Sequence, residues 1–461
     1  ATDAILAYSQ ACLSDSEKTA DIKRVNRAEM MRTLARLAQD IQEPGIIEET
    51  LQLVAGGIGC VCELQESTLG VVLPFLLDYY CRDNIFLRAV AMEQLLLVAQ
   101  KHGISLARLL SAFAGSISCT LASTLAQRSP RSFAHCMQIL ETTPKQFLRQ
   151  HQDAILPHLV ASGNEAALRH VAEILDVQLP VLCVNQAPVV FVKIFLMDDQ
   201  LMHQAMLRFV RLISVGSGID ADQVEVNVPS LLRSCSVKLI FNLILSLGEE
   251  DGVLRRRARS ALLTVQNILA SATSDAKQGV STIVQRSVDN LKDVAGDHSP
   301  KPGVAAQQQQ QQQQTPSAEL ADFLSQHILG VLAYVNELLR DSEQSAPGSK
   351  VADVMAYHQQ QRKRMVLRAI GELATLLGPR SLPFTTNIVA SLTPPLDGPL
   401  AAAALRSWVI LAENLSHATL SAEQLNSLII PLLTTFATCS EETRRGAASA
   451  VNRVVKLHER E

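Results

Sequence analysis

The chain has 461 residues, enough for two to four ordinary domains or for one long array of repeats. Although 48% of the residues are hydrophobic, only 4% are aromatic, so Leu, Ala, Val and Ile must fill the core, and this favours packing of helix on helix. The formal net charge of −4 gives no overall attraction to nucleic acid or to an anionic membrane.

The ends and the cysteines indicate the class of protein. The start, "ATDAILAYSQ", has neither the basic region nor the apolar core of a signal peptide, and no apolar run is long enough to span a bilayer. The nine dispersed cysteines do not suit a disulfide framework, and we interpret Cys60 and Cys62 as buried helical thiols rather than zinc ligands. We therefore expect a soluble intracellular chain. Because it lacks an initiator Met and ends within a polar helical pattern, we expect a piece of a longer protein.

Apolar residues recur at helical spacing along the chain, often around a Leu-Arg step. The predicted buried stripes are Leu87, Val90, Ala91, Leu95 and Val98; Leu168, Val171 and Leu175; Val366, Ile370, Leu373 and Leu377; and Leu405, Trp408, Val409 and Ala412. Gly103 and the Gly378–Pro379 pair are typical helix stops. The stretch "PVLCVNQAPVVFVKIFL" at 180–196 resembles a strand by composition, but its setting between helical patterns favours helices.

A proline, a capping residue and an arginine recur in the same order in three places. The three sets are Pro74, Asp83 and Arg88; Pro157, Asn164 and Arg169; and Pro431, Ser440 and Arg445. We interpret each proline as opening one helix, each polar residue as the N-cap of the next, and each arginine as reaching a carboxylate or a turn carbonyl of the following hairpin. Since one hairpin cannot bury both its faces, the pattern predicts an all-α, HEAT-like α-solenoid of stacked helical hairpins. Generic antiparallel helices without repeat stacking are the alternative.

One segment interrupts the helical pattern. Residues 295–318, "AGDHSPKPGVAAQQQQQQQQTPSA", carry no apolar stripe, and we expect a disordered Gln-rich linker there. The linker divides HEAT-like repeats at 1–294 from a helical domain at 319–437, after which 438–461 begins a further repeat. Residues 340–350 form a shorter loop between helices.

The sequence lacks the motifs of the common catalytic, phosphate-binding and metal-binding sites. "AGGIGCV" at 55–61 follows a helical stripe and lacks the lysine of a phosphate-binding loop, so it reads as a helix end. The 11 histidines are scattered, and Pro157 is expected to break the helix between His151 and His158. No G-x-S-x-G, H-R-D or D-F-G motif occurs. We therefore predict no catalytic, cofactor-binding or metal-binding residue and no cofactor.

Two basic clusters remain, "RRRAR" at 255–259 and "RKRMVLR" at 362–368. Aromatic residues that would stack on bases do not accompany them. We interpret both clusters as solvated helix faces with salt links. Contact with phosphates or with an acidic partner is the alternative.

Residues 320–437 contain "FLSQHILGVLAYVNELL", "AIGELATLLGP" and "RSWVILAENL", and these segments resemble the UME domain in the helical solenoid of ATR-family checkpoint kinases. Upstream, "YYCRDNIFLRAVAMEQLLLVAQKHGISLARLL", "HCMQILETTPKQFLRQHQDAILPHLV" and "LLRSCSVKLIFNLILSLGEE" resemble the preceding solenoid more loosely. The Gln tract departs from the family pattern.

The resemblance implies a non-catalytic scaffold segment of a nuclear serine/threonine protein kinase that acts in DNA-damage and replication checkpoint signalling and DNA repair. Kinase motifs would lie beyond residue 461, and no catalytic residue of the family matches this chain. An ATRIP-like subunit and checkpoint proteins are the implied partners, with a homodimer formed through the parent and nucleic-acid contact left open, and no membrane contact. The alternatives are a free-standing HEAT adaptor, of the transport or phosphatase-scaffold type, and an α-helical enzyme.

Overall fold

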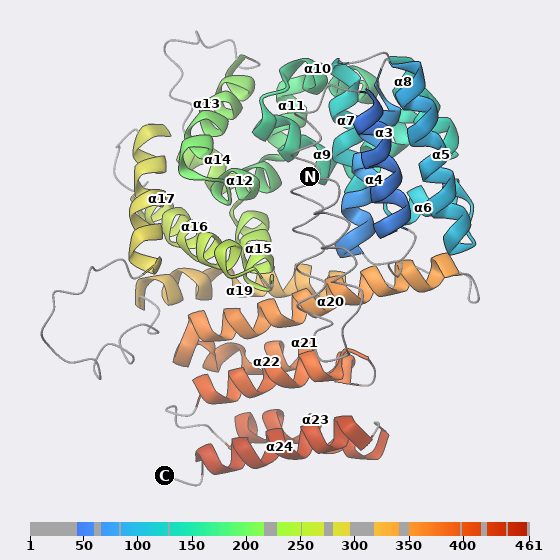
Figure 1. The fold of residues 1–461 in the computed structure, drawn as a ribbon. Coiled ribbons are helices and arrows are strands. Elements are labelled where there is room, and N and C mark those ends of the chain that lie inside the picture. Colours follow the sequence, from blue (N-terminus) through green and yellow to red (C-terminus); the bar gives the residue numbers. More distant parts are fainter. Residues whose placement is uncertain are drawn as a thin grey trace, which may run out of the picture. The chain divides into compact units, whose positions relative to one another are not determined.

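Helices alone make up the regular structure of the described residues (Figure 1). The computed structural model describes residues 44–59, 66–82, 84–127, 130–215, 228–249, 251–271, 280–295, 318–340, 350–396, 399–415, 422–438 and 441–458. They fall into two compact units, one formed by Ala1–Leu182 with Ser345–His358 and the other by Cys183–Gln344 with Gln359–Glu461. The helices α11 (Leu179–Asn185) and α20 (Lys350–Leu377) contribute residues to both.

The first unit is a series of packed helical hairpins. Its elements are α3 (Pro44–Leu53), the π-helix η2 (Val54–Gly59), α4 (Glu66–Tyr80), α5 (Ile85–His102), α6 (Leu106–Ala112), α7 (Ala114–Gln127), α8 (Pro130–Ile139), α9 (Pro144–Ser162) and α10 (Glu165–Leu175). The hairpin α4–α5 is followed by α7, which packs on α4, and α9 packs in turn on α7 and on its hairpin partner α10. Each hairpin therefore covers an apolar face of the one before it.

The second unit repeats this arrangement. Its elements are α12 (Ala187–Phe195), α13 (Asp199–Val215), α14 (Val228–Ser234), α15 (Ser236–Leu247), α16 (Gly252–Ser271), α17 (Val280–Ala295), α19 (Ala318–Arg340), the 3-10 helix η3 (Gly378–Phe384), α21 (Thr385–Leu392), the 3-10 helix η4 (Pro394–Leu396), α22 (Ala401–Asn414), α23 (Ala422–Thr438) and α24 (Glu441–His458). The helices α15, α19, α21 and α23 pack in succession, and α22 packs on α24, as neighbouring layers in Figure 1. The predicted all-α solenoid of stacked hairpins is confirmed. Residues 296–317, which hold most of the predicted linker, and 341–349, within the predicted loop, lie outside the described residues.

Capping explains several of the helix boundaries. The Asn84 side chain accepts hydrogen bonds from the backbone N–H groups of Phe86 and Leu87 at 3.0 and 3.2 Å, and so begins α5. Gly103 ends α5 with φ 67°, a left-handed conformation that glycine adopts without strain. Asn164 caps α10 as predicted, accepting from the N–H of Ala167 at 3.2 Å. The N-cap of α5 is thus Asn84 and not the predicted Asp83, and both Asp83 and the predicted cap Ser440 lie outside the described residues.

The predicted stripes are buried, but the role given to the prolines was wrong. All the stripe residues are buried except Val409, which is partly exposed. Pro74, Pro157 and Pro431 do not open helices, because they lie inside α4, α9 and α23. An interior proline removes one backbone hydrogen bond and clashes with the preceding turn, at a cost of about 3 kcal/mol in an isolated helix. A buried leucine next to each proline, Leu73, Leu156 or Leu432, packs in the core and helps to keep the helix continuous.

Two further local expectations are corrected. The segment "AGGIGCV" does not end the helix at once, because α3 continues as the π-helix η2 through Gly59. His151 and His158 share the single helix α9, since Pro157 does not break it. The ambiguous stretch 180–196 is helical, as predicted, and contributes to α11 and α12.

No single helix of the described residues is both long and apolar enough to cross a membrane. Within the described ranges, one pair of segments, Leu106–Ala112 and Ala114–Ser123, reaches that threshold together by length and composition, and the two are bent by 94°.

Candidate interaction surface

Neighbouring helices of the second unit pack closely at Gly371, Ser407 and Gly446. The Ser407 hydroxyl of α22 donates a hydrogen bond to the backbone carbonyl of Leu367 in α20, at 2.6 Å. Next to this bond, a Cβ built on Gly371 would lie 3.0 Å from Ser407 Oγ and 3.2 Å from Ile410 Cδ1. On the following layer, a Cβ on Gly446 of α24 would lie 2.9 Å from a methyl group of Leu405. The helices therefore approach closely because these positions carry no side chain.

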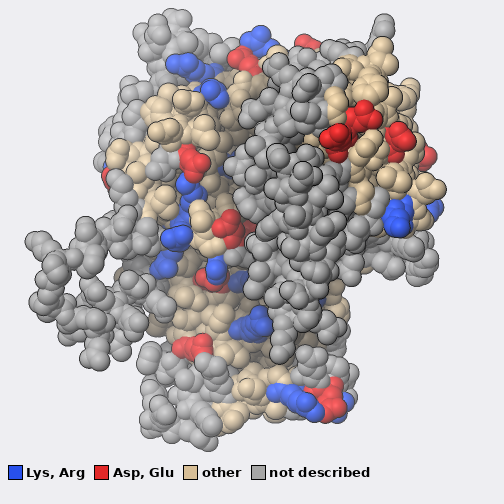
Figure 2. All heavy atoms as spheres, in the orientation of Figure 1, with Lys and Arg blue, Asp and Glu red and all other residues tan. Residues whose placement is uncertain are grey.

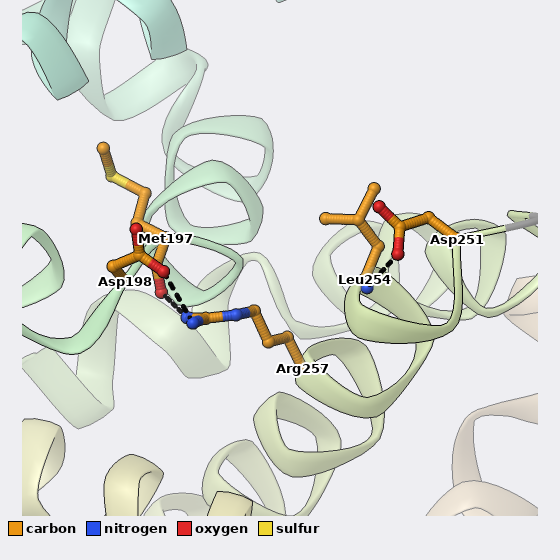
Figure 3. Close-up of polar contacts among 5 residues, drawn as sticks. All are labelled: Met197, Asp198, Asp251, Leu254 and Arg257. Carbon is orange, nitrogen blue, oxygen red and sulfur yellow. Dashed lines mark hydrogen bonds and ion pairs between the residues drawn. The ribbon is translucent and has the colours of Figure 1, made fainter. Parts of the chain in front are cut away.

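Arg257 ties α16 to the turn between α12 and α13 (Figure 3). Its Nη2 lies 2.7 Å from Asp198 Oδ1, and its Nη1 donates to the carbonyl of Met197. The side chain of Arg257 is only 16% exposed, but that of Asp198 is 78% exposed, so water screens the ion pair more than the bond to the Met197 carbonyl. Asp251 caps the same helix by accepting from the N–H groups of Val253 and Leu254, at 2.7 and 3.4 Å. The arginine thus fixes helices separated by 59 residues in the sequence.

Two more arginines link elements that are distant in sequence. Arg255 Nη1 lies 3.8 Å from Glu372 Oε1, which brings the cluster at 255–259 near the end of α20. Arg380 of η3 pairs with Asp322 of α19 at 2.7 Å and also donates to the carbonyl of Ala318. The salt links predicted for the 255–259 cluster are confirmed at Arg255 and Arg257, but only Arg255 is well exposed to solvent, because the Arg257 side chain is mostly buried. The sequence reading missed Arg380, because no local motif marks it.

Two arginines of the proline, cap and arginine pattern, Arg169 and Arg445, pair within their own helix rather than with the following hairpin as predicted. Arg169 pairs with Glu165 at 2.6 Å, and Arg445 pairs with Glu441, each one turn earlier in the same helix. Arg88 donates to the carbonyl of Arg82 at 3.1 Å, within its own hairpin. Each of these guanidinium groups thus bonds to an acceptor that lies near it in the sequence.

Figure 2 shows small groups of Lys and Arg interspersed with Asp and Glu, rather than one continuous basic field, over the coloured part of this face. A protein that follows a nucleic-acid backbone uses an extended positive stripe, and the coloured residues of this face do not form one. Among the described residues, no group of three or more His, Cys, Asp or Glu side chains is placed to hold a metal ion.

The described cysteines lie in apolar surroundings. Cys81 and Cys136 are buried with their sulfur atoms 3.8 Å apart, and the hydrogen bond between them, together with burial, raises the pKa of Cys136. Burial also raises the pKa of Cys183 to about 12 and that of Cys235 to about 11. These thiols therefore stay protonated. The pair Cys60 and Cys62 lies outside the described residues.

The outer face of α5 is the most apolar exposed helix face of the first unit. Ile85, Phe86, Leu96 and Leu97 are exposed by 80%, 51%, 49% and 41%. They lie opposite the buried stripe of the same helix, and Glu93 is exposed on the same side. The sequence reading identified the buried stripe of α5 but missed this second apolar face.

Residues 323–435, which cover α21, α22 and most of α19 and α23, match the UME (NUC010) domain family. The chain carries a UME domain. The resemblance predicted for residues 319–437 is therefore confirmed, and the domain contains the seam formed by Leu367, Gly371 and Ser407.

A wider similarity extends beyond the UME domain. Protein kinase rad3 of Schizosaccharomyces pombe is 21% identical over 321 residues, covering 70% of this chain and 11% of that kinase. The predicted resemblance to part of an ATR-family kinase is thus confirmed, and the chain spans only a small share of the length of this relative.

Solved structures give weaker likenesses. An engineered protein shares 12% identity at a TM-score of 0.23, covering 98% of both chains. The SYS-1/POP-1 complex contains a chain with 10% identity and a TM-score of 0.22, where the match covers 99% of this chain and 91% of that one. The assignment of the fold rests on the stacked hairpins described above.

Proposed function

We propose that this chain is a non-catalytic scaffold and interaction segment of an ATR-like serine/threonine protein kinase that acts in DNA-damage and replication checkpoint signalling. The match of residues 323–435 to the UME domain carries the proposal. These residues lie in a helical stack, where close contacts such as that of Gly371 with Ser407 set the packing of successive layers. The similarity to rad3 over 70% of the chain supports the same parent.

The proposed role is mechanical and adhesive. Each stacked hairpin contacts mainly its neighbours, so small rotations add up along the array and carry a change of shape to a distant kinase region. The exposed helix faces of such an array offer docking sites for protein partners. An ATRIP-like subunit and checkpoint proteins are the proposed partners, and the nucleus is the proposed location.

The coding sequence gives the first test of this proposal. Downstream of residue 461 it should encode the motif set of a protein kinase in the same reading frame. A stop codon soon after residue 461 would contradict the proposal and favour a free-standing adaptor.

A matched pair of variants in the full-length gene gives a functional test. Gly371→Val forces apart α20 and α22, whereas Gly252→Val adds the same atoms where a Cβ meets nothing within 4 Å. Cells that carry Gly371→Val should become sensitive to replication stress and lose checkpoint phosphorylation, while Gly252→Val cells should behave as wild type. Equal resistance of both strains, with the parent protein present at normal levels, would refute the scaffold role of this stack.

A further inference from the structure

The helix α5 is apolar on both sides, unlike other helices of the array that begin with a Leu-Arg step. The comparable helix α10 exposes Glu165, Ala166, Arg169 and Glu173, so one face is polar. By contrast, α5 buries one apolar stripe and exposes Ile85, Phe86, Leu96 and Leu97 on the opposite face. A helix that is hydrophobic all round is normally covered on all sides. The exposed side of α5 is thus more apolar than that of α10.

The exposed residues of α5 have a definite layout. At 3.6 residues per turn, Ile85, Ala89 and Leu96 line one edge of the exposed face, Phe86 and Leu97 line the other, and Glu93 and Gln100 lie between the two edges. The four large side chains together expose on the order of 400 Å² of apolar surface, the size of the largest patches on monomeric proteins. Within the described part of the chain, Glu93 forms no ion pair. The patch is thus an apolar strip with one carboxylate near its centre.

Size and charge identify the occupant. A stable dimer buries about 800 Å² on each partner, roughly twice this strip, whereas a single docked helix needs less. Two copies of α5 packed face to face would bring Glu93 close to its counterpart, because Glu93 lies near the middle of the strip. Like charges desolvated at such a contact repel each other. The strip therefore does not suit a second copy of this chain.

We infer that the outer face of α5 docks an amphipathic helix of a partner protein, whose apolar stripe is interrupted by one Lys or Arg that pairs with Glu93. Residues Ile85 to Leu97 span about 18 Å along the helix axis, which accommodates anchors at positions i, i+4 and i+7 of a docked helix. The cation is required because a covered carboxylate without a counter-charge disfavours binding. This inference rests on the proposed scaffold role and names one surface that would serve it.

The test uses the whole chain and two synthetic peptides of 18 residues, the length of α5. Both peptides form helices with a Leu/Ala stripe and a Gln-rich opposite face; one has Lys at the centre of the stripe and the other has Glu. Binding is measured by fluorescence anisotropy for the wild type, for Glu93→Lys and for Glu337→Lys. Glu337 is a matched control because it is an exposed glutamate on another helix, α19.

The Lys peptide should bind the wild type and Glu337→Lys with equal affinity. Its affinity for Glu93→Lys should be at least about 10-fold lower. The Glu peptide should show the reverse preference and bind Glu93→Lys best. Failure of either peptide to discriminate between these variants, or no binding by either, would overturn the inference. Sedimentation of the wild type alone supplies another outcome: a dimer that Leu97→Asp abolishes would assign the strip to a second copy.

These results are independent of the test of the parent protein. Failure of the peptides would leave the scaffold role to other surfaces. A stop codon after residue 461 would refute the kinase parent without changing the expected peptide binding.

Discussion

Replacing Gly371 with valine should destabilise the second unit strongly, because α20 and α22 touch at this position. A Cβ alone would already lie 3.0 Å from Ser407 Oγ and 3.2 Å from Ile410 Cδ1, and valine adds two further carbons beyond it. Overpacking of this kind costs about 1–3 kcal/mol. Moving Ser407 away would also break its 2.6 Å bond to the Leu367 carbonyl, worth about 1 kcal/mol. The higher helix propensity of valine returns only a few tenths of a kcal/mol.

The expected net loss is therefore about 2–4 kcal/mol in the free energy of unfolding. Trp408 is the single tryptophan of the chain and is buried in α22 next to Ser407, so its fluorescence during urea unfolding reports on this layer. The control is Gly252→Val in α16, where a Cβ meets nothing within 4 Å and the stability should change by less than about 0.5 kcal/mol. If both variants unfold at the same urea concentration, α20 and α22 do not approach each other as described.

Three other perturbations have expected outcomes. Leu367→Asp places a carboxylate on a fully buried stripe and should cost about 4 kcal/mol or more, visible as lost helicity by circular dichroism; normal melting would refute the burial. Arg257→Ala should cost about 1–3 kcal/mol, because it removes both the ion pair with Asp198 and the hydrogen bond to the Met197 carbonyl. Asp198→Asn should cost less, because the bond from Arg257 to the Met197 carbonyl remains. Equal urea midpoints for these two variants would argue against that bond. Burial lowers the pKa of His327, so the unfolded chain binds a proton first and stability should fall as the pH drops below about 6.5. In His327→Gln the urea midpoint should depend less on pH between 7.5 and 5.5, and an unchanged dependence would contradict this assignment.

The buried stripes could be predicted because helical spacing records burial directly. Leu168, Val171 and Leu175 repeat every three or four residues, and this periodicity survives whatever the helix packs against. Proline positions were less informative. The preference of proline for the first turn is statistical, and at Pro157 the packing of α9 on α7 and α10 outweighs the local cost of an interior proline.

The outer face of α5 escaped the sequence reading for a different reason. The search for one apolar stripe is satisfied by Leu87, Val90 and Leu95, and it assigns no meaning to Phe86 and Leu97. Counting apolar residues on both sides of the helix would have found them. The close approach of α20 and α22 leaves no such pattern in the sequence. A glycine inside a helix does not by itself indicate whether another helix packs against it.

Some of the arginines pair within their own helix and others pair with a different helix, and the residue one turn earlier differs between the two groups. Arg169 and Arg445 each have a glutamate four residues before them, and they pair with it. Such a pair needs little ordering because both side chains already lie on the same helix face. Arg257 has Val253 at the corresponding position, and its guanidinium instead reaches Asp198 on another helix.

Arg380 and Arg255 extend this rule. Arg380 has no acid one turn earlier and pairs with Asp322, 58 residues before it in the sequence. Arg255 does follow Asp251 by four residues, but that carboxylate already caps α16, and the longer contact to Glu372 forms instead. Arg257 and Arg380 thus reach other elements where no acid lies at position i−4, but the lack of such an acid does not decide the outcome alone, because Arg88 follows Asn84 by four residues and stays within its own hairpin. In the Leu-Arg steps at the heads of α5 and α10, Leu87 and Leu168 are buried, and Arg88 and Arg169 bond to acceptors near them in the sequence.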